Sequence, residues 1–320
     1  MTQFAVSSPH ISQSAVYWQL DSGFRCALYS DDAEVLERAS GVLAAESAGN
    51  TGMVGITLSW HIGRPDENDA WWAQPLTDST PEIKAETLAE LLAHIEYGAL
   101  QEFLAGGTDS FFSLHAALLT KNGRSVVIVG PKEAGKSTLA CALWTLRGWT
   151  LRGDDSVLVD THNNVCPSPR RVSLRYGSRA LLGEELWSRL SALPSTFHTG
   201  QGLLFHPHEL ENQNSPEAAP PLSAIFFLAR RESKAASAQT TPLAPAPGAL
   251  ALLPYSTFLL PRGEYLLCPS RVDWGAALPR LTTLAACVPM FDLGRGPLDA
   301  MTHEVERLVF HANPIATSAS

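Results

Sequence analysis

Nine consecutive residues near the middle of the chain have the types and spacing needed to bind a nucleotide phosphate. They are Gly130, Pro131, Lys132, Glu133, Ala134, Gly135, Lys136, Ser137 and Thr138. The run fits G-x-x-x-x-G-K-S, in which glycines let backbone N–H groups curl around a β-phosphate. In that pattern the lysine reaches the β- and γ-phosphates, and the serine hydroxyl ligates magnesium. We therefore expect the run to bind ATP, with Lys136 on the phosphates and Ser137 on Mg2+.

An acidic pair, Asp154 and Asp155, begins 18 residues after Lys136. A hydroxyl that attacks a γ-phosphate needs a carboxylate to accept its proton. Magnesium-bound ATP needs a second carboxylate, held directly or through water. Adjacent aspartates can divide these two tasks, and the alternative is a pair of solvated turn residues.

Three arginines follow the acidic pair at short distance, and a guanidinium group pairs well with phosphate oxygens. They are Arg170, Arg171 and Arg175. We select Arg170 as the phosphate ligand, because Arg171 and Arg175 also fit a solvated strand face. Lys132 and Glu133 occupy variable positions of the loop and need no special role.

The elements around the loop fit the strand–loop–helix context that this motif requires. An apolar strand, Ser125 to Val129, precedes the loop, and the helix-forming sequence LACALWTL follows it. This context argues against the alternative, a chance match in a glycine-containing turn. The turn Lys121 to Gly123 predicts a hairpin between the strand before it and the apolar strand after it. The acidic pair ends the strand that is expected to follow the helix, near Gly148 to Gly153.

The N-terminal part of the sequence predicts a separate α/β segment at residues 1–107. Strands at Tyr17 to Leu20 and Phe24 to Tyr29 flank a turn, and Asp31 with Glu34 suits a capping box for the next helix. A strand at Gly55 to His61 follows. A long helix, with Ile83 on its apolar stripe, is expected to start at Thr80-Pro81 and to end at Gly106-Gly107.

The C-terminal part is expected to complete a P-loop domain at residues 108–310, with a flexible tail at 311–320. A strand at Leu222 to Ala229 lies between two segments that read as loops, Glu211 to Pro221 and Glu232 to Gly248. A helix at Leu298 to Val309 closes the domain.

Bulk properties limit the class of protein. The 320 residues, 45% of them hydrophobic, are enough for a sizeable core without a metal or a disulfide. Five scattered cysteines without a C-x-x-C suggest a reducing cytoplasm. No signal sequence and no apolar run of about 18 residues is present, so no membrane partner is expected. A net charge of −9 with scattered arginines argues against nucleic acid.

The sequence also resembles the C-terminal catalytic domain of HPr kinase/phosphorylase and its shorter relatives, a fold shared with phosphoenolpyruvate carboxykinase. The likeness covers about residues 108 to 230. It is carried by His115, the loop Gly130 to Thr138, the G-W-x-x-x-x-D-D run that ends in Asp155, the strand Ser156 to Asp160, the Asn163-Asn164 turn and the loop Pro167 to Arg170.

The resemblance implies an α/β fold with a P-loop kinase domain of HPr kinase/PEP carboxykinase type, and ATP and Mg2+ as cofactors. It implies that Asp154 is the base facing the acceptor and that Asp155 is the partner on the metal side. His115 would lie close to the catalytic aspartate and the phosphate, although a lone histidine on a strand is also often a packed core residue.

Two departures from the family pattern affect the expected reaction. HPr kinases place a glutamate after the P-loop serine, where this chain has Thr138, and Pro261 to Glu264 matches poorly the family signature linked to phosphorolysis. Phosphorolysis, and HPr as substrate, are therefore not expected. The shorter relatives phosphorylate other acceptors, including serine hydroxyls of ribosomally made peptides.

Other P-loop classes lack their signatures in this chain. The sequence contains no N-K-x-D, no L-S-G-G-Q and no arginine-rich lid. We expect an ATP-dependent kinase whose acceptor is a serine hydroxyl of a peptide or protein partner. A kinase for a free serine-type small molecule and a non-catalytic ATP-sensing module are the alternatives. The sequence is also compatible with a homo-oligomer.

Overall fold

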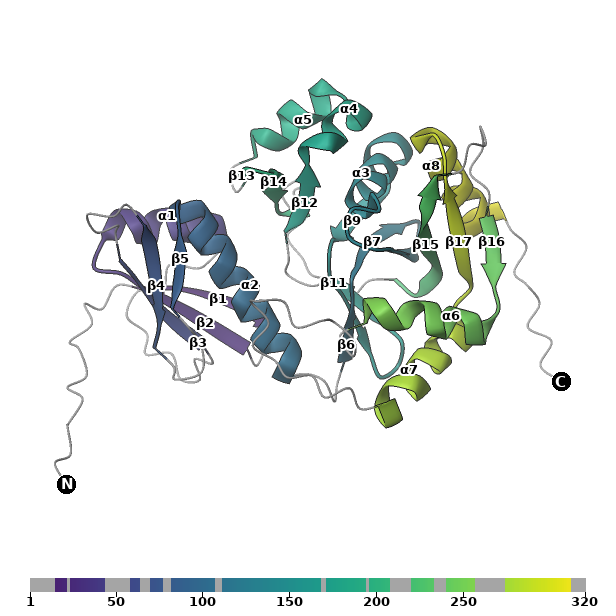
Figure 1. The fold of residues 1–320 in the computed structure, drawn as a ribbon, viewed down its shortest axis with the longest axis horizontal. Helices are drawn as coiled ribbons and strands as arrows, with labels where there is room; N and C mark the ends of the chain where they lie inside the picture. Colours follow the sequence, from purple (N-terminus) through teal and green to yellow (C-terminus); the bar gives the residue numbers. More distant parts are fainter. Residues whose placement is uncertain are drawn as a thin grey trace. The chain divides into compact units, whose positions relative to one another are not determined.

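The structure is a computed structural model that describes residues 15–21, 24–43, 58–63, 70–76, 82–106, 111–167, 171–193, 196–207, 220–232, 240–256 and 274–311. The chain divides into two compact units, Met1–Phe103 and Leu104–Ser320. Each unit combines strands with helices (Figure 1). The predicted α/β class is therefore confirmed. Among the described helices, none has the length and the apolar character needed to cross a membrane.

The first unit is built on a five-stranded sheet in the order β1-β2-β3-β4-β5. Its strands are β1 (Ala15–Asp21), β2 (Phe24–Tyr29), β3 (Leu58–Gly63), β4 (Trp71–Pro75) and β5 (Ile83–Ala85), and its helices are α1 (Ala33–Leu43) and α2 (Leu88–Gly106). Strands β2 and β3 pair in parallel and the other neighbours are antiparallel. The predicted β1–β2 hairpin and the helix after it are confirmed.

Two helix starts in this unit differ from the prediction. The second helix begins at Leu88, and Ile83 instead belongs to β5. The hydroxyl of Thr87 accepts the Glu90 N–H at 3.1 Å, which satisfies a free donor of the first turn. In α1, the cap is not Asp31 but Asp32, whose carboxylate accepts the backbone N–H two residues on at 3.0 Å. Thr80-Pro81 lies outside the described residues.

The second unit contains a six-stranded sheet in the order β16-β17-β15-β8-β7-β9. Its strands are β7 (Ala116–Lys121), β8 (Arg124–Val129), β9 (Thr150–Gly153), β15 (Leu222–Glu232), β16 (Thr240–Leu243) and β17 (Met290–Arg295). Strands β8, β15 and β17 are parallel, so their carboxyl ends meet at one edge of the sheet. That edge is where ligands bind in many open α/β sheets.

Strand β8 is buried on both faces of the sheet. Val126 and Ile128 pack into one core together with α3 (Lys136–Arg147) and α8 (Leu298–Glu306). Val127 and Val129 pack into the other, with α6 (Pro245–Leu252) and α7 (Trp274–Cys287). Alternate side chains of a strand point to opposite faces, so this one strand joins both cores.

Two smaller sheets complete the unit. One has the order β11-β10-β6, with β6 (Phe111–Leu114), β10 (Val157–Asp160) and β11 (Val165–Pro167). The other has the order β12-β14-β13, with β12 (Val172–Arg175), β13 (Phe197–Thr199) and β14 (Gly202–Phe205), and carries α4 (Arg179–Leu182) and α5 (Glu184–Ser191). We call residues 171–207 the small-sheet segment (Figure 1).

Several predictions on this unit can be compared with the structure. The hairpin is confirmed, because β7 and β8 pair antiparallel and Asn122 and Gly123 both have positive φ, 49° and 70°. The predicted loop Glu232 to Gly248 is wrong in part, since it contains β16 and the start of α6. The last helix ends at Glu306 and continues as a π-helical turn, Arg307–His311. Residues 208–219 and 312–320 lie outside the described part.

Candidate active site

The loop between β8 and α3 has the conformation that its glycines require. Gly135 has φ 93°, in the left-handed region that favours glycine. A Cβ at Gly130 would lie 3.1 Å from the Cβ of Leu228 and 3.2 Å from that of Ala134. No side chain caps the start of α3 at Gly135. The loop therefore leads into a helix N-terminus, which carries partial positive charge and suits an anion.

Lys136 is folded back over the loop that precedes it. Its Nζ donates to the carbonyl oxygens of Gly130 at 3.0 Å and Pro131 at 3.3 Å, and lies 2.9 Å from Nε2 of His115. The lysine is only 6% exposed. A phosphate on the loop would compete with these contacts for the ammonium group.

Asp154 follows β9 and lies against the serine of the loop. Its Oδ2 accepts the Ser137 hydroxyl at 2.6 Å and the backbone N–H of Ser173 at 3.3 Å. The residue is 1% exposed, and its Oδ1 is buried without a hydrogen-bond partner. Burial raises the pKa of this carboxyl, and the charge of Asp155 raises it further, whereas Ser137 and Lys136 act in the opposite direction. Such an oxygen is an acceptor without a partner, which is rare for a buried polar atom.

Asp155 and His115 form a second pair beside the loop. The carboxylate Oδ1 of Asp155 lies 2.8 Å from Nδ1 of His115, and Asp155 has φ 63°, a conformation that non-glycine residues adopt at a cost. Since Nδ1 faces a carboxylate and Nε2 faces the Lys136 ammonium, the partners assign the proton to Nδ1. The imidazole of His115 thus contacts Lys136 on one side and Asp155 on the other.

His115 is held by the backbone at a bend rather than within a strand. It separates β6 from β7, and its N–H donates to the carbonyl oxygen of Tyr255 at 2.7 Å. Its side chain keeps 24% of its surface exposed. The imidazole therefore faces the pocket above the loop and is not a packed core side chain.

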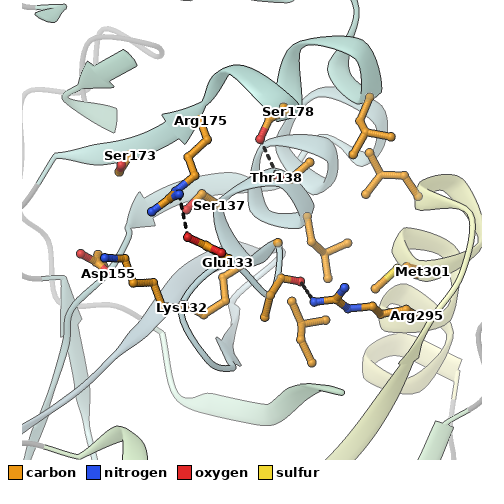
Figure 2. A pocket seen from close by; sticks show the side chains of 18 of the residues that line it. Lys132, Glu133, Ser137, Thr138, Asp155, Ser173, Arg175, Ser178, Arg295 and Met301 are labelled. Carbon is orange, nitrogen blue, oxygen red and sulfur yellow. Dashed lines mark hydrogen bonds and ion pairs between the residues drawn. The ribbon is translucent and has the colours of Figure 1, made fainter. Parts of the chain in front are cut away.

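A pocket of about 750 Å³ lies over the loop. Figure 2 shows Asp155 and Lys132 toward one end of it and Arg295 and Met301 toward the other. The small-sheet segment adds Arg175 to its wall. A pocket of this size, with a few polar groups and an apolar lining, is typical of small-molecule and cofactor sites.

No protein-family model matches this sequence, and no curated protein does. Among solved structures, the chain is similar to the HPr(Ser) kinase/phosphatase from Coxiella burnetii. The identity is 15% and the TM-score is 0.30, over 62% of this chain and 87% of the other. The relation is distant and carries no argument about the activity of this chain.

Most of the residues selected from the sequence come together in one place. The loop, His115, Asp154 and Asp155 all lie at the same pocket or directly beneath it. Arg170 lies outside the described residues. Arg171 is 4% exposed, with its guanidinium 4.5 Å from the centre of the Phe197 ring, so it is not on a solvated strand face.

Two arginines at the pocket were not selected from the sequence. Arg175, at the end of β12, pairs with a loop side chain, Glu133. Arg295 donates to the carbonyl oxygen of Ala134 at 3.1 Å, although 161 residues separate them. No motif marks Arg295. Its only signal is that it ends β17, a strand parallel to the one that carries the loop.

In the described part of the chain, no group of three or more His, Cys, Asp or Glu side chains is placed to hold a metal ion. The pair Ser137 and Asp154 nevertheless fits magnesium. Both offer oxygen, the ligand that Mg2+ prefers, and nucleotide sites hold Mg2+ with one or two protein oxygens plus phosphates and water. The buried Oδ1 of Asp154, which lacks a partner, agrees with this donor set.

Proposed function

We propose that this protein is an ATP-dependent phosphotransferase that moves the γ-phosphate to a hydroxyl group. One observation carries the proposal: the loop serine bonds to a buried aspartate at 2.6 Å, while the next aspartate pairs with a histidine that contacts the loop lysine. Nucleotide binding alone needs no second carboxylate of this kind. Transfer to a hydroxyl does need one, to take the proton.

The pocket suggests which way ATP lies. The Lys136 ammonium marks the β- and γ-phosphates, and its contact with His115 directs the γ end toward Asp155. The other end of the pocket has apolar side chains from α8, Leu298 and Met301. An adenine ring fits that end, because nucleoside bases offer a flat apolar face.

Ser137 and Asp154 would hold Mg2+ in this proposal. The cation, when bound, neutralises charge on the β- and γ-oxygens of ATP. Asp154 would bring a carboxylate whose burial is costly without a cation, which gives the pair a preference for the loaded state.

Asp155 is the better candidate for the base. The family resemblance gives that role to Asp154 and the metal side to Asp155, but the contacts favour the reverse. Asp154 is buried against Ser137, whereas Asp155 lines the pocket and its carboxylate is oriented by the Nδ1–H of His115.

The proposed reaction uses this arrangement directly. The acceptor oxygen forms a bond to the γ-phosphorus, and the bond from that phosphorus to the β-phosphate oxygen breaks, which releases ADP. The acceptor proton passes to the Asp155 carboxylate, and Lys136 stays on the phosphate oxygens.

We take the acceptor to be a serine hydroxyl in a peptide or protein. The test is incubation of the purified protein with magnesium and ATP labelled at the γ-phosphate, with serine peptides, HPr and free serine as separate acceptors. Label on a peptide or on HPr supports the proposal, whereas label on free serine alone moves the acceptor to a small molecule. Binding of ATP without any transfer overturns the transferase and leaves an ATP-sensing module.

Two matched variants test the roles of the aspartates. Asp155→Asn should bind ATP within about threefold of the wild type and lose at least about 100-fold in transfer rate. Asp154→Asn should instead lose the magnesium dependence of ATP binding. An active Asp155→Asn, together with an inactive Asp154→Asn that binds Mg·ATP normally, would return the base role to Asp154.

A further inference from the structure

An ion pair joins the phosphate-binding loop to the small-sheet segment. Nη1 of Arg175, the last residue of β12, lies 2.7 Å from Oε1 of Glu133, the fourth residue of the loop (Figure 2). Both side chains line the pocket. The pair therefore lies where the phosphates of a nucleotide would lie.

A carboxylate at this position opposes the function proposed for the loop. Glu133 adopts φ 68°, a left-handed conformation that costs energy for a residue with a side chain. Its negative charge would also repel a bound phosphate. In the structure, this charge instead holds the Arg175 guanidinium over the loop.

The contact is suited to exchange. The side chains keep 42% (Arg175) and 61% (Glu133) of their surface exposed, and ion pairs this exposed are weak. A phosphate group carries more charge than a carboxylate and matches the guanidinium fork with two oxygens. A nucleotide on the loop should therefore take the arginine from the glutamate.

The arginine is attached to a firm support. The Thr138 and Ser178 hydroxyls, both buried, lie 2.8 Å apart and connect α3 to the residues just after β12. Arg175 also pairs with Gly202 of β14, and a Cβ at that glycine would lie 1.9 Å from the carbonyl oxygen of Leu174. Only glycine fits there, so the end of β12 is fixed against its neighbour.

Arg295, the other arginine of the pocket, is less suited to the γ end. It lies toward Met301 in Figure 2 and donates to the Ala134 carbonyl. Arg175 reaches the loop at Glu133 instead, one residue after Lys132, which lies toward the Asp155 end.

We propose that Arg175 binds the γ-phosphate of ATP and that Glu133 holds this arginine in place until the nucleotide binds. The proposal rests on nucleotide binding by the loop, as argued above. It assigns a role to two residues that the loop motif leaves undefined.

The test is calorimetric titration of the full-length protein with ATP and with ADP, both in magnesium. Arg175→Gln should raise the Kd for ATP by about tenfold or more, since a hydrogen bond to a charged group is lost. The Kd for ADP should change by less than about threefold, because ADP lacks the γ-phosphate. Arg175→Lys should recover part of the loss.

Glu133→Gln should tighten ATP binding, and this gain should shrink in the double variant with Arg175→Gln, because the two residues act on each other. Arg179→Gln is the matched control. Its partner Glu184 lies 2.6 Å away, the pair is similarly exposed, and Arg179 does not line the pocket. This variant should bind ATP like the wild type. Thermal melting of all variants reports whether they are folded.

The outcomes separate the two proposals. A wild type that binds neither nucleotide overturns the proposed function itself. A wild type that binds ATP while Arg175→Gln binds it equally well overturns only the role of the arginine. Equal losses for ATP and ADP overturn the assignment to the γ-phosphate, and a gain for Glu133→Gln that is undiminished without the arginine overturns the holding role of Glu133.

Discussion

Asp154→Asn should make the nucleotide-free protein more stable while it removes the magnesium dependence of ATP binding. The Asp154 carboxylate is buried, and its Oδ1 has no hydrogen-bond partner. An asparagine has nearly the same volume, and its carbonyl oxygen can still accept the Ser137 hydroxyl. A neutral amide is less costly to bury than a carboxylate. The substitution should therefore lower the free-energy cost of burying this side chain, a cost that the proposed metal site requires.

The size of the gain follows from the cost of a buried polar group without a partner. That cost is about 1–3 kcal/mol, and the amide retains part of it, so a net gain of about 1–2 kcal/mol is expected where the Asp154 carboxyl is ionised in the folded protein. For a domain of this size, this corresponds to a rise in Tm of about 2–8 °C.

The gain should depend on pH in a defined direction. Burial holds the pKa of Asp154 in the folded protein above its ordinary value of 3.8. Between pH 3.8 and the higher pKa of Asp154 in the folded protein, the folded wild type binds more protons than the unfolded chain. Its stability therefore falls as pH rises through this window. The variant lacks this group, so its advantage should be small near pH 4 and should grow as pH rises.

The measurement is thermal melting of both proteins from pH 4 to pH 8, with a chelator present. Asp160→Asn is the control, because its carboxylate accepts the backbone N–H groups of His162 and Asn164 away from the pocket, and its loss should not stabilise the protein. A lower Tm for Asp154→Asn at pH 7, or a gain that is the same at every pH, would refute the reasoning. With Mg·ATP added, the wild type should gain more Tm than the variant.

Three further substitutions test other parts of the site. His115→Asn should lower the transfer rate by about 10- to 100-fold with a smaller change in the Kd for ATP, which stopped-flow and calorimetry can separate; equal losses in both would contradict an orienting role. Met301→Glu should weaken ATP binding but leave tripolyphosphate binding nearly unchanged, and equal effects on both would exclude this end of the pocket as the adenine site. Gly130→Ala, which would bring a Cβ to 3.1 Å from Leu228, should lower stability by about 1–3 kcal/mol in urea unfolding. Gly98→Ala, in a helix with open space around it, should not destabilise the protein, and an equal loss there would contradict the packing argument.

The features that the sequence predicted well have local causes. Asn122 and Gly123 specify their turn by themselves, since both must adopt positive φ. The phosphate-binding loop and the aspartate pair also lie within one strand–helix–strand unit. A contiguous motif therefore carries most of the selected site.

The features that it missed depend on contacts between distant segments. Ile83 is in phase with the apolar stripe of α2, and only pairing with β4 makes it part of a strand. Pro242 and Pro245 made their segment look like a loop. In the structure, one lies in the edge strand β16 and the other in the first turn of α6, two places where proline is tolerated. Arg295 reaches the site only because β17 and β8 end at the same edge.

Strand β8, buried on both faces, has a consequence for how this protein can change. Its side chains alternate between two separate cores, so the start of the loop at Gly130 cannot shift without disturbing both cores. The described residues of the small-sheet segment contribute to one of these cores and not to the other, and helices α4 and α5 are largely exposed. New acceptors can therefore be accommodated by altering α4 and α5, while the loop and β12, which would bind phosphate, keep their shape.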